Sequence, residues 1–317
     1  MSDTVLVVGA GPTGLSAAAG VASIGKKVIL VEKESVLGGA PILSGYAKLV
    51  PSGEWAKDAI GRMVKRVEDN PNVTVYKSTK VVKVDGEAGN FTVTFSNGQT
   101  ANVGSIILGT GFTHFDSINK PEWGFGTYED VLTTTQMEQM VGTGKITCPS
   151  NGRVPERVAI LLCVGSRDRQ IGREWCSKIC CTVSTNLAME IKEISPTTEV
   201  FIYYMDIRTF GLYEDKFYWK SQEEFKTKFV KARIAEVTKS ADGRLLVKGE
   251  DTLVKRPIVI PMDLVVHAIG MDPSEENPEL SKVFGIGLKS TALLIKASNI
   301  PAHSAAPVVV FTWVARP

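Results

Sequence analysis

The sequence is poor in cysteine and histidine and has almost no surplus of charge. Its 317 residues include five cysteines and three histidines, and 36 Lys and Arg against 34 Asp and Glu give a net charge of +2. A balance this even argues against a nucleic-acid-binding protein, which carries a basic surplus or basic clusters. The scattered His114, His267 and His303 suggest neither a metal site nor a catalytic triad, so we expect structural or surface roles for them.

Long hydrophobic runs are also missing. A run such as VAILLCV at 158–164 is far shorter than the roughly 20 apolar residues that a membrane-spanning helix needs. The N-terminal MSDTVLVVGAG enters a strand-like segment directly, without the basic region and apolar stretch of a secretory signal. We therefore expect a cytoplasmic protein with no transmembrane segment and no nucleic-acid partner. In a reducing cytosol, clustered cysteines favour metal or redox chemistry over structural disulfides.

A glycine-rich turn follows the first predicted strand, residues 4–8. The segment GAGPTG places Gly9, Gly11 and Gly14 at the spacing G-x-G-x-x-G, before a predicted helix and a second strand that ends in Glu32. Gly9 permits the tight turn, Gly11 a close approach to a pyrophosphate, and Gly14 the contact between helix and strand. The helix N-terminus offers unpaired N–H groups to phosphates, and Glu32 is placed to accept hydrogen bonds from a ribose. Together these features predict a dinucleotide site.

Two further segments favour FAD as the dinucleotide. In KESVLGG, Gly38 and Gly39 resemble an extension found in the flavoprotein family with two dinucleotide-binding domains, where it belongs to the FAD site. The GTG at 109–111 resembles the segment that passes FAD where the chain leaves the first domain. Between them, residues 80–103 alternate apolar and polar with turn signals and predict a β-meander. This resemblance implies FAD contacts from Gly9, Gly11, Pro12, Thr13, Gly14, Glu32, Lys33, Gly38, Gly39, Val81, Thr110 and Gly111.

Cysteines stand where a second nucleotide-binding loop is expected. A predicted strand at 157–165 leads into CVGSRDRQIGREWC, in which Gly165 and Gly172 lack phosphate-cradling spacing. The later DLVVHAIGMDP resembles the return segment into the FAD domain. We therefore expect an α/β fold with two dinucleotide-binding (Rossmann-like) domains of the thioredoxin-reductase/glutathione-reductase type, the second modified to hold an iron–sulfur cluster. The predicted parts are an FAD-binding domain, first part (1–115), a linker (116–156), the modified domain (157–256) and the second part of the FAD domain (257–317).

Four of the five cysteines share one short segment, with the spacing Cys163-x(12)-Cys176-x(3)-Cys180-Cys181. Cys163 ends a predicted strand, and the other three lie at the start of a helix predicted over 177–194, where the helix dipole and unpaired N–H groups stabilise thiolates. Adjacent cysteines are awkward in a zinc tetrahedron but can bind different irons of a larger cluster. We favour a [4Fe–4S] cluster, and zinc, a dithiol–disulfide pair and plain packing remain alternatives.

The rest of the cysteine segment supports an anionic group. Its cations outnumber its acids, with Arg167, Arg169, Arg173 and Lys178 against Asp168 and Glu174. Such a surplus offsets the charge of several thiolates. Cys148, in KITCPSNG, falls outside the pattern, and we expect it to be structural.

Several motifs together resemble one family. CVGSRD…CSKICC, DIRTFG, YEDKFY and KARIAEV…VKGEDTL…DLVVHAIGMDP are similar to the flavin core of HdrA, the flavoprotein subunit of heterodisulfide reductase, over roughly residues 1–290. The resemblance is closest to the short HdrA-like subunits of sulfur-oxidising bacteria. It implies an oxidoreductase: an electron-transfer subunit with FAD and a [4Fe–4S] cluster, acting in sulfur-compound oxidation. The implied cluster ligands are Cys163, Cys176, Cys180 and Cys181.

The same resemblance implies partners and a division of labour. The partners are the other subunits of a heterodisulfide-reductase-like complex and a second copy of the chain in a homodimer. The thiol chemistry would lie on another subunit, so we predict no catalytic residue here. After STALLIK at 290–296 the family continues through an FxAG segment and a helix. Their glycine, acid and helix are missing from this sequence, so we expect the second part of the FAD domain to be incomplete.

Two other functions fit the sequence less well. An NAD(P)H-dependent flavin disulfide oxidoreductase needs a second glycine loop and a redox C-x-x-C, and the sequence has neither. A scaffold subunit stabilised by FAD and a metal would hold a flavin that cannot be reduced, which distinguishes it from an electron carrier.

Overall fold

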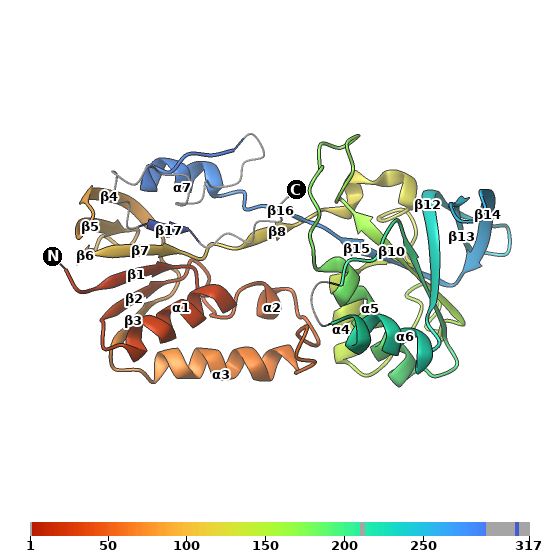
Figure 1. The fold of residues 1–317 in the computed structure, drawn as a ribbon, viewed down its shortest axis with the longest axis horizontal. Helices are drawn as coiled ribbons and strands as arrows, with labels where there is room; N and C mark the ends of the chain where they lie inside the picture. The colour runs from red at the N-terminus through yellow and green to blue at the C-terminus, as the bar shows by residue number, and fades with distance from the viewer. Residues whose placement is uncertain (1, 210–212, 290–307, 311–317) are drawn as a thin grey trace. The chain divides into compact units, whose positions relative to one another are not determined.

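A computed structural model describes residues 2–209, 213–289 and 308–310. The chain forms two compact units, and each is described by itself (Figure 1). Unit 1 comprises Met1–Gly45, Trp55–Thr113 and Asp272–Val314, and unit 2 comprises Tyr46–Glu54 and His114–Met271. The chain passes from one unit to the other in strands β8 (Phe112–His114) and β16 (Met271–Pro273), which pair with each other.

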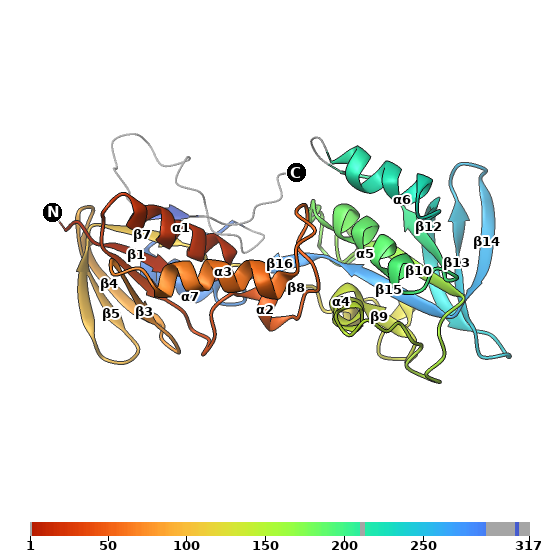
Figure 2. The ribbon, with the colours of Figure 1, turned by 90° about the horizontal axis from the view of Figure 1, so that it is seen from below.

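Unit 1 is built on a parallel five-stranded sheet in the order β17-β7-β1-β2-β3. Its strands are β1 (Val5–Val8), β2 (Val28–Val31), β3 (Val73–Tyr76), β7 (Ser105–Leu108) and β17 (Val308–Val310). Helices α1 (Pro12–Ser23) and α3 (Ala56–Glu68) lie along one face of this sheet (Figures 1 and 2). The carboxyl ends of β1 and β2 therefore share one edge, where open α/β sheets bind ligands.

The other face of this sheet packs on a three-stranded antiparallel meander. Its strands are β4 (Val81–Glu87), β5 (Asn90–Phe95) and β6 (Thr100–Val103). Phe91, Val93 and Phe95 of β5 form one apolar cluster with residues of β1 and β7. The meander predicted over 80–103 is thus confirmed. Helices α2 (Ala40–Leu43) and α7 (Asn277–Phe284) complete the unit.

Unit 2 contains a seven-stranded sheet in the order β14-β13-β12-β11-β10-β15-β9. The five strands from β9 to β12 in this order are parallel, and β13 and β14 add an antiparallel hairpin. Their bounds are β9 (Val131–Thr133), β10 (Arg157–Val164), β11 (Glu199–Tyr204), β12 (Lys228–Lys239), β13 (Leu245–Asp251), β14 (Arg256–Met262) and β15 (Leu264–Ile269).

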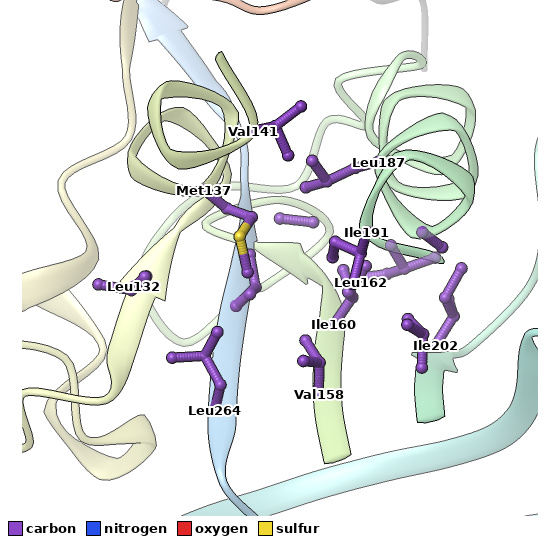
Figure 3. Close-up of a cluster of buried hydrophobic side chains, with 14 of the residues drawn as sticks. Leu132, Met137, Val141, Val158, Ile160, Leu162, Leu187, Ile191, Ile202 and Leu264 are labelled. Atoms are coloured by element: carbon purple, nitrogen blue, oxygen red, sulfur yellow. The ribbon is translucent and has the colours of Figure 1, made fainter. Parts of the chain in front are cut away.

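Helices α4 (Thr134–Gly142) and α5 (Cys180–Ile194) cover one face of the unit 2 sheet. The alternate residues Val158, Ile160 and Leu162 of β10 point toward these helices (Figure 3), and Ala159 and Leu161 join a second cluster on the opposite face. Burial on both faces explains why β10 is an unbroken apolar run. The shorter helices are η1 (Ser117–Asn119), η2 (Pro121–Trp123), η3 (Glu214–Trp219) and α6 (Lys220–Glu223).

Two predicted segments flank the modified domain. Residues 116–156, predicted as a linker, supply β9 and α4 to unit 2. The prediction of an incomplete end to the FAD domain falls mostly on residues 290–317, which lie outside the described residues except for β17. Within the part of the chain that the structure describes, no helix has the length and apolar character to cross a bilayer.

Candidate flavin and cysteine sites

The glycine turn of unit 1 occupies residues 9–11, between β1 and α1. Gly9 has φ of 93°, and a Cβ on it would lie 2.4 Å from the Gly109 carbonyl oxygen. A Cβ on Gly14 would lie 1.7 Å from the Gly9 carbonyl oxygen. These two glycines are therefore demanded by the protein's own backbone packing.

Gly11 differs from its two neighbours in the motif. A Cβ there would meet only the Gly39 Cα, at an ordinary contact distance of 3.8 Å. The fold does not require glycine at this position, because a side chain would find room there. With glycine, that space beside the Gly11 backbone holds no protein atom. Close approach of a pyrophosphate requires such bare backbone, so the turn fits a dinucleotide.

Glu32 lies beside the turn, at the end of β2. Its carboxylate is buried and accepts a hydrogen bond from the Ala10 N–H to Oε2 at 2.6 Å and another from the Glu34 N–H to Oε1 at 3.0 Å. Each carboxylate oxygen has a second lone pair, which leaves acceptor capacity for ribose hydroxyls. The motif spacing predicted the acid but gave no signal for its bond to Ala10.

The remaining predicted FAD residues come from four segments of unit 1. Gly38 donates its N–H to the Ala10 carbonyl at 2.9 Å, and the Thr110 Cα approaches Gly9 from the end of β7. Gly39 fits against Gly11 so closely that a Cβ on it would lie 2.7 Å from the Gly11 Cα. The others are Pro12 and Thr13 in the first turn of α1, Gly111 just after Thr110, and buried Val81 at the start of β4.

Lys33 is held by an acid that the sequence did not single out. Its Nζ lies 3.0 Å from Glu276 Oε2, and the Nζ of Lys80 lies 2.7 Å from Glu276 Oε1. Both lysines lower the pKa of Glu276, against the opposing effect of its partial burial. Glu276, just before α7, thus joins the segments that follow β2 and precede β4.

The cysteine segment of unit 2 follows β10. Cys163 lies near the end of the strand with φ of 64°, and α5 begins at Cys180. The prediction of a helix from residue 177 was wrong, because Lys178 has φ of 61° and interrupts the helical backbone. Cys176 and Cys180 therefore do not share a helical face. Cys176 comes from the loop, where its Sγ accepts a hydrogen bond from the Lys178 N–H at 3.3 Å.

All four cysteines of the segment are buried, and none forms a disulfide. The pKa of Cys180 is lowered, chiefly because the Cys163 and Cys181 thiols donate hydrogen bonds to its sulfur. The pKa values of Cys163 and Cys181 are raised, because each would lose that bond and meet the charge on Cys180, and because each is buried. The sulfurs of Cys163, Cys180 and Cys181 are therefore neighbours. They cannot all lose their protons unless a metal cation takes the place of those protons.

One predicted cation faces these thiols. Arg167, ion-paired with Asp206, lowers the pKa of Cys163 and acts electrostatically on Cys176 as well. Arg169 is largely exposed and pairs with Glu174, whereas Arg173 lies over aromatic rings. The surplus of cations in the sequence therefore predicted Arg167 as a neighbour of the thiols but was misleading for Arg169 and Arg173. It gave no signal for Asp206.

The four sulfurs suit a cluster better than a single metal ion. Among residues 2–209 and 213–289, no three His, Cys, Asp or Glu side chains stand close enough to bind one ion. Zinc would hold all four sulfurs at about 2.3 Å from one centre. A four-iron cluster gives each thiolate its own iron and so suits ligands that stand farther apart. Four buried sulfurs, three of which share coupled protons, fit such a group.

The glycines after β10 are not arranged as in the turn of unit 1. Gly165 has φ of 71°, and a Cβ on it would lie 2.1 Å from the ring of Phe115. The Phe115 ring therefore packs directly on the Gly165 backbone. Gly172 is exposed and in open surroundings, away from such a turn.

Cys148 is separate from the other thiols. Its Sγ donates a weak hydrogen bond to the Asp263 carbonyl at 3.7 Å, and burial beside Asp130 and Asp263 raises its pKa to about 12. None of the four clustered thiols is among the groups that shift its pKa, which agrees with a position apart from the cysteine segment.

Comparison with known proteins decides the family. Residues 3–169, more than half of the chain, match the family described as pyridine nucleotide-disulphide oxidoreductase. The chain belongs to this family. The match ends within the cysteine segment, before Cys176. Membership confirms the prediction of an oxidoreductase and implies a flavin cofactor.

The curated relatives confirm the resemblance to HdrA. The iron-sulfur HdrA subunit of CoB–CoM heterodisulfide reductase from Methanocaldococcus jannaschii is 30% identical, over 91% of this chain and 56% of the relative. The HdrA subunit of H2:CoB-CoM heterodisulfide,ferredoxin reductase from Methanothermobacter thermautotrophicus is 40% identical, over 62% of this chain and 30% of the relative. The chain thus spans about half the length of the curated relatives it matches, or less.

Solved structures confirm the predicted fold class. T. acidophilum thioredoxin reductase has a TM-score of 0.63 and 17% identity, over 98% of this chain and 90% of that one. Lactococcus lactis thioredoxin reductase has a TM-score of 0.59 and 17% identity, over 98% and 89%. At this identity the likeness concerns the fold alone.

Proposed function

We propose that the chain is an FAD- and [4Fe–4S]-containing electron-transfer subunit of a heterodisulfide-reductase-like complex. The observation that carries the proposal is the cysteine segment. Four buried free cysteines lie at the end of β10 and in the segment that follows it, where a nucleotide loop would stand, and Gly165 in that segment packs against Phe115. The name of the Methanocaldococcus jannaschii relative, which describes an iron-sulfur subunit, supports this assignment.

In unit 1 the chain's own groups would bind FAD. The bare backbone at Gly11 and the N–H groups at the start of α1 would receive the pyrophosphate, and Glu32 would accept hydrogen bonds from the ribose. The Ala10 and Glu34 N–H groups keep the Glu32 carboxylate in place for this contact. The other predicted contacts, Lys33 and Val81 among them, would surround the adenosine half.

In unit 2, Cys163, Cys176, Cys180 and Cys181 would ligate the cluster. Arg167 and the N-terminus of α5 would offset the negative charge of the thiolates. When bound, FAD exchanges electrons in pairs and the cluster exchanges them singly, so that together they connect two-electron and one-electron carriers. Burial of the four cysteines would keep the cluster out of water.

The finer assignments rest on the family resemblance. We propose that the partners are other subunits of a heterodisulfide-reductase-like complex, that the chain forms a homodimer in the cytoplasm, and that the complex oxidises sulfur compounds. In that case electrons enter and leave through partner proteins, and the substrate thiols react elsewhere.

Metal analysis tests the cluster. Iron, acid-labile sulfide and zinc per chain should be measured in anaerobic preparations of the parent and of alanine variants of all five cysteines. We expect iron and sulfide in the parent and in Cys148→Ala, and their loss in each of the other four. Electron paramagnetic resonance of the reduced protein would identify the cluster type. One zinc per chain without sulfide would overturn the proposal, and loss of iron in Cys148→Ala would overturn the choice of ligands.

Reduction by nicotinamide nucleotides distinguishes this function from that of an NAD(P)H-dependent flavin disulfide oxidoreductase. Because Gly165 and Gly172 lack the spacing of a phosphate loop, NADH and NADPH should not bleach the flavin within catalytic times in a stopped-flow experiment. Dithionite should reduce the same flavin fully, which excludes the scaffold function. Rapid bleaching by either nucleotide would restore the NAD(P)H-dependent oxidoreductase.

A further inference from the structure

Buried serine hydroxyls accompany the cysteines. Ser166, Ser177 and Ser184 are almost fully buried, and none of their hydroxyls has a hydrogen-bond partner among the described residues. An unpaired buried polar group costs about 1–3 kcal/mol, so most such groups find a partner. An unpaired hydroxyl beside a cofactor site therefore points to an acceptor that the bound group supplies.

Of these three serines, Ser177 is the one next to Cys176 in the chain. It lies between Cys176 and the interrupted turn at Lys178, and its hydroxyl approaches the sulfur of Cys180. The two groups form no hydrogen bond in this structure, so the hydroxyl is left without a partner. In the same turn the Lys178 N–H already donates to the Cys176 sulfur at 3.3 Å. The turn at 176–178 thus directs two donors toward ligand sulfurs.

We propose that the Ser177 hydroxyl donates a hydrogen bond to the Cys180 thiolate of the bound cluster and thereby raises the cluster's reduction potential. Reduction adds negative charge to the cluster and its thiolates, and a donor stabilises the more negative state. Ser177 is accordingly a positioning and tuning residue, not a ligand. This inference rests on the proposed function, since it requires the cluster.

Ser166 provides a matched control in the same segment. It is equally buried and equally unpaired, but its Oγ is directed at Gly270, where a Cβ would lie 2.4 Å from it. Removing that hydroxyl should leave the cluster's potential unchanged.

The test is a redox titration of the full chain, monitored by electron paramagnetic resonance, on Ser177→Ala, Ser177→Thr and Ser166→Ala. We expect Ser177→Ala to keep its iron and sulfide while its midpoint potential moves to a more negative value. Ser177→Thr, which keeps a hydroxyl, should recover most of the parent potential, and Ser166→Ala should match the parent. If Ser177 had only a structural role, Ser177→Thr would not restore the midpoint potential that Ser177→Ala had shifted.

The outcomes separate this inference from the proposed function. A full cluster with the parent potential in Ser177→Ala overturns the inference alone, as does an equal shift in Ser166→Ala. If Ser177→Ala loses its iron, the near-isosteric pair Ser177→Thr and Ser177→Val makes the same comparison, and equal potentials in that pair refute the hydrogen bond. A parent protein without sulfide overturns both proposals.

Discussion

In unit 1 the loop between β1 and α1 is residues 9–11, whereas in unit 2 the loop between β10 and α5 is residues 165–179. Both loops follow a strand inside a parallel sheet and precede a helix packed on that sheet. The short loop presents backbone, stripped of side chains by its glycines. The long loop holds Cys176, while Cys163 comes from β10 and Cys180 and Cys181 from α5. Under the proposed function, one strand–loop–helix unit serves a phosphate in unit 1 and a metal cluster in unit 2.

The two sites also use a helix N-terminus in different ways. The N-terminal N–H groups of α1 are left for an anionic ligand that approaches from outside. In α5 the first two positions are Cys180 and Cys181, so two of the chain's own sulfur atoms lie at the favourable end of the dipole. Under the proposed function, unit 1 would thus bind a charged ligand, whereas in unit 2 the charge would belong to the chain's own sulfur atoms.

The largest expected effects come from the glycines of unit 1. Gly14→Val should prevent unit 1 from folding, because its Cβ would collide with the Gly9 carbonyl. Gly11→Val should lose the flavin completely and keep the fold of the apoprotein, because its Cβ has room. Flavin absorbance and circular dichroism measure the two properties, and iron content should persist in Gly11→Val. Stoichiometric flavin in Gly11→Val would refute the N-terminal dinucleotide site.

A smaller effect concerns buried carboxylates. Glu32 in unit 1 accepts two backbone hydrogen bonds, whereas Glu190 in unit 2 has one unpaired oxygen and lies near Glu138. Burial, chiefly, and then Glu138 raise the pKa of Glu190 to about 7, although Lys48 and Asn186 act in the opposite direction. The folded state therefore binds this proton more tightly than the unfolded state, so stability falls as pH rises from about 4.5 to 7.

Glu190→Gln should remove the loss of folding stability that deprotonation of Glu190 causes at higher pH. At pH 8 the variant should be more stable than the parent by about 3 kcal/mol, and the two should converge near pH 4.5. Urea unfolding at both pH values measures the difference. Glu193→Gln is the control, since Glu193 also contacts Lys48 at 3.5 Å but is largely exposed. Equal stability of Glu190→Gln and the parent at pH 8 would show that the carboxylate is solvated.

The smallest effect tests how Lys33 is held. Glu276→Gln weakens the ion pairs with Lys33 and Lys80, which are partly exposed and worth roughly 0.5 kcal/mol each. We expect about a twofold higher Kd for FAD in titrations of the apoprotein, and a smaller change at high salt. Glu68→Gln breaks the exposed pair with Lys77 in the same unit and should leave the Kd unaltered. An unaltered Kd in Glu276→Gln would separate this ion-pair cluster from the nucleotide.

The sequence was most informative where function depends on backbone. Gly9, Gly11 and Gly14, the acid at Glu32 and the meander all follow from spacing and alternation, which are local properties. It was less informative about the cysteine loop. A positive φ at Lys178 has no signature in a lysine, so the helix was predicted to begin three residues too early. Asp206 and Glu276 reach their partners from distant segments, and no spacing rule connects them with Arg167 or Lys33.

The order of the segments along the chain governs how the protein is made. Unit 1 begins first, but α7 and β17 come from residues beyond Asp272, so its sheet lacks an edge strand until unit 2 has been synthesised. Segment Tyr46–Glu54 belongs to unit 2 but is synthesised early, between parts of unit 1. Ala47 donates its N–H to Glu138, so this segment leaves the ribosome well before its partner helix exists. Unit 2 is consequently the first to have all of its described strands, and a fragment that stops after Met271 would hold the cysteines without a finished flavin domain.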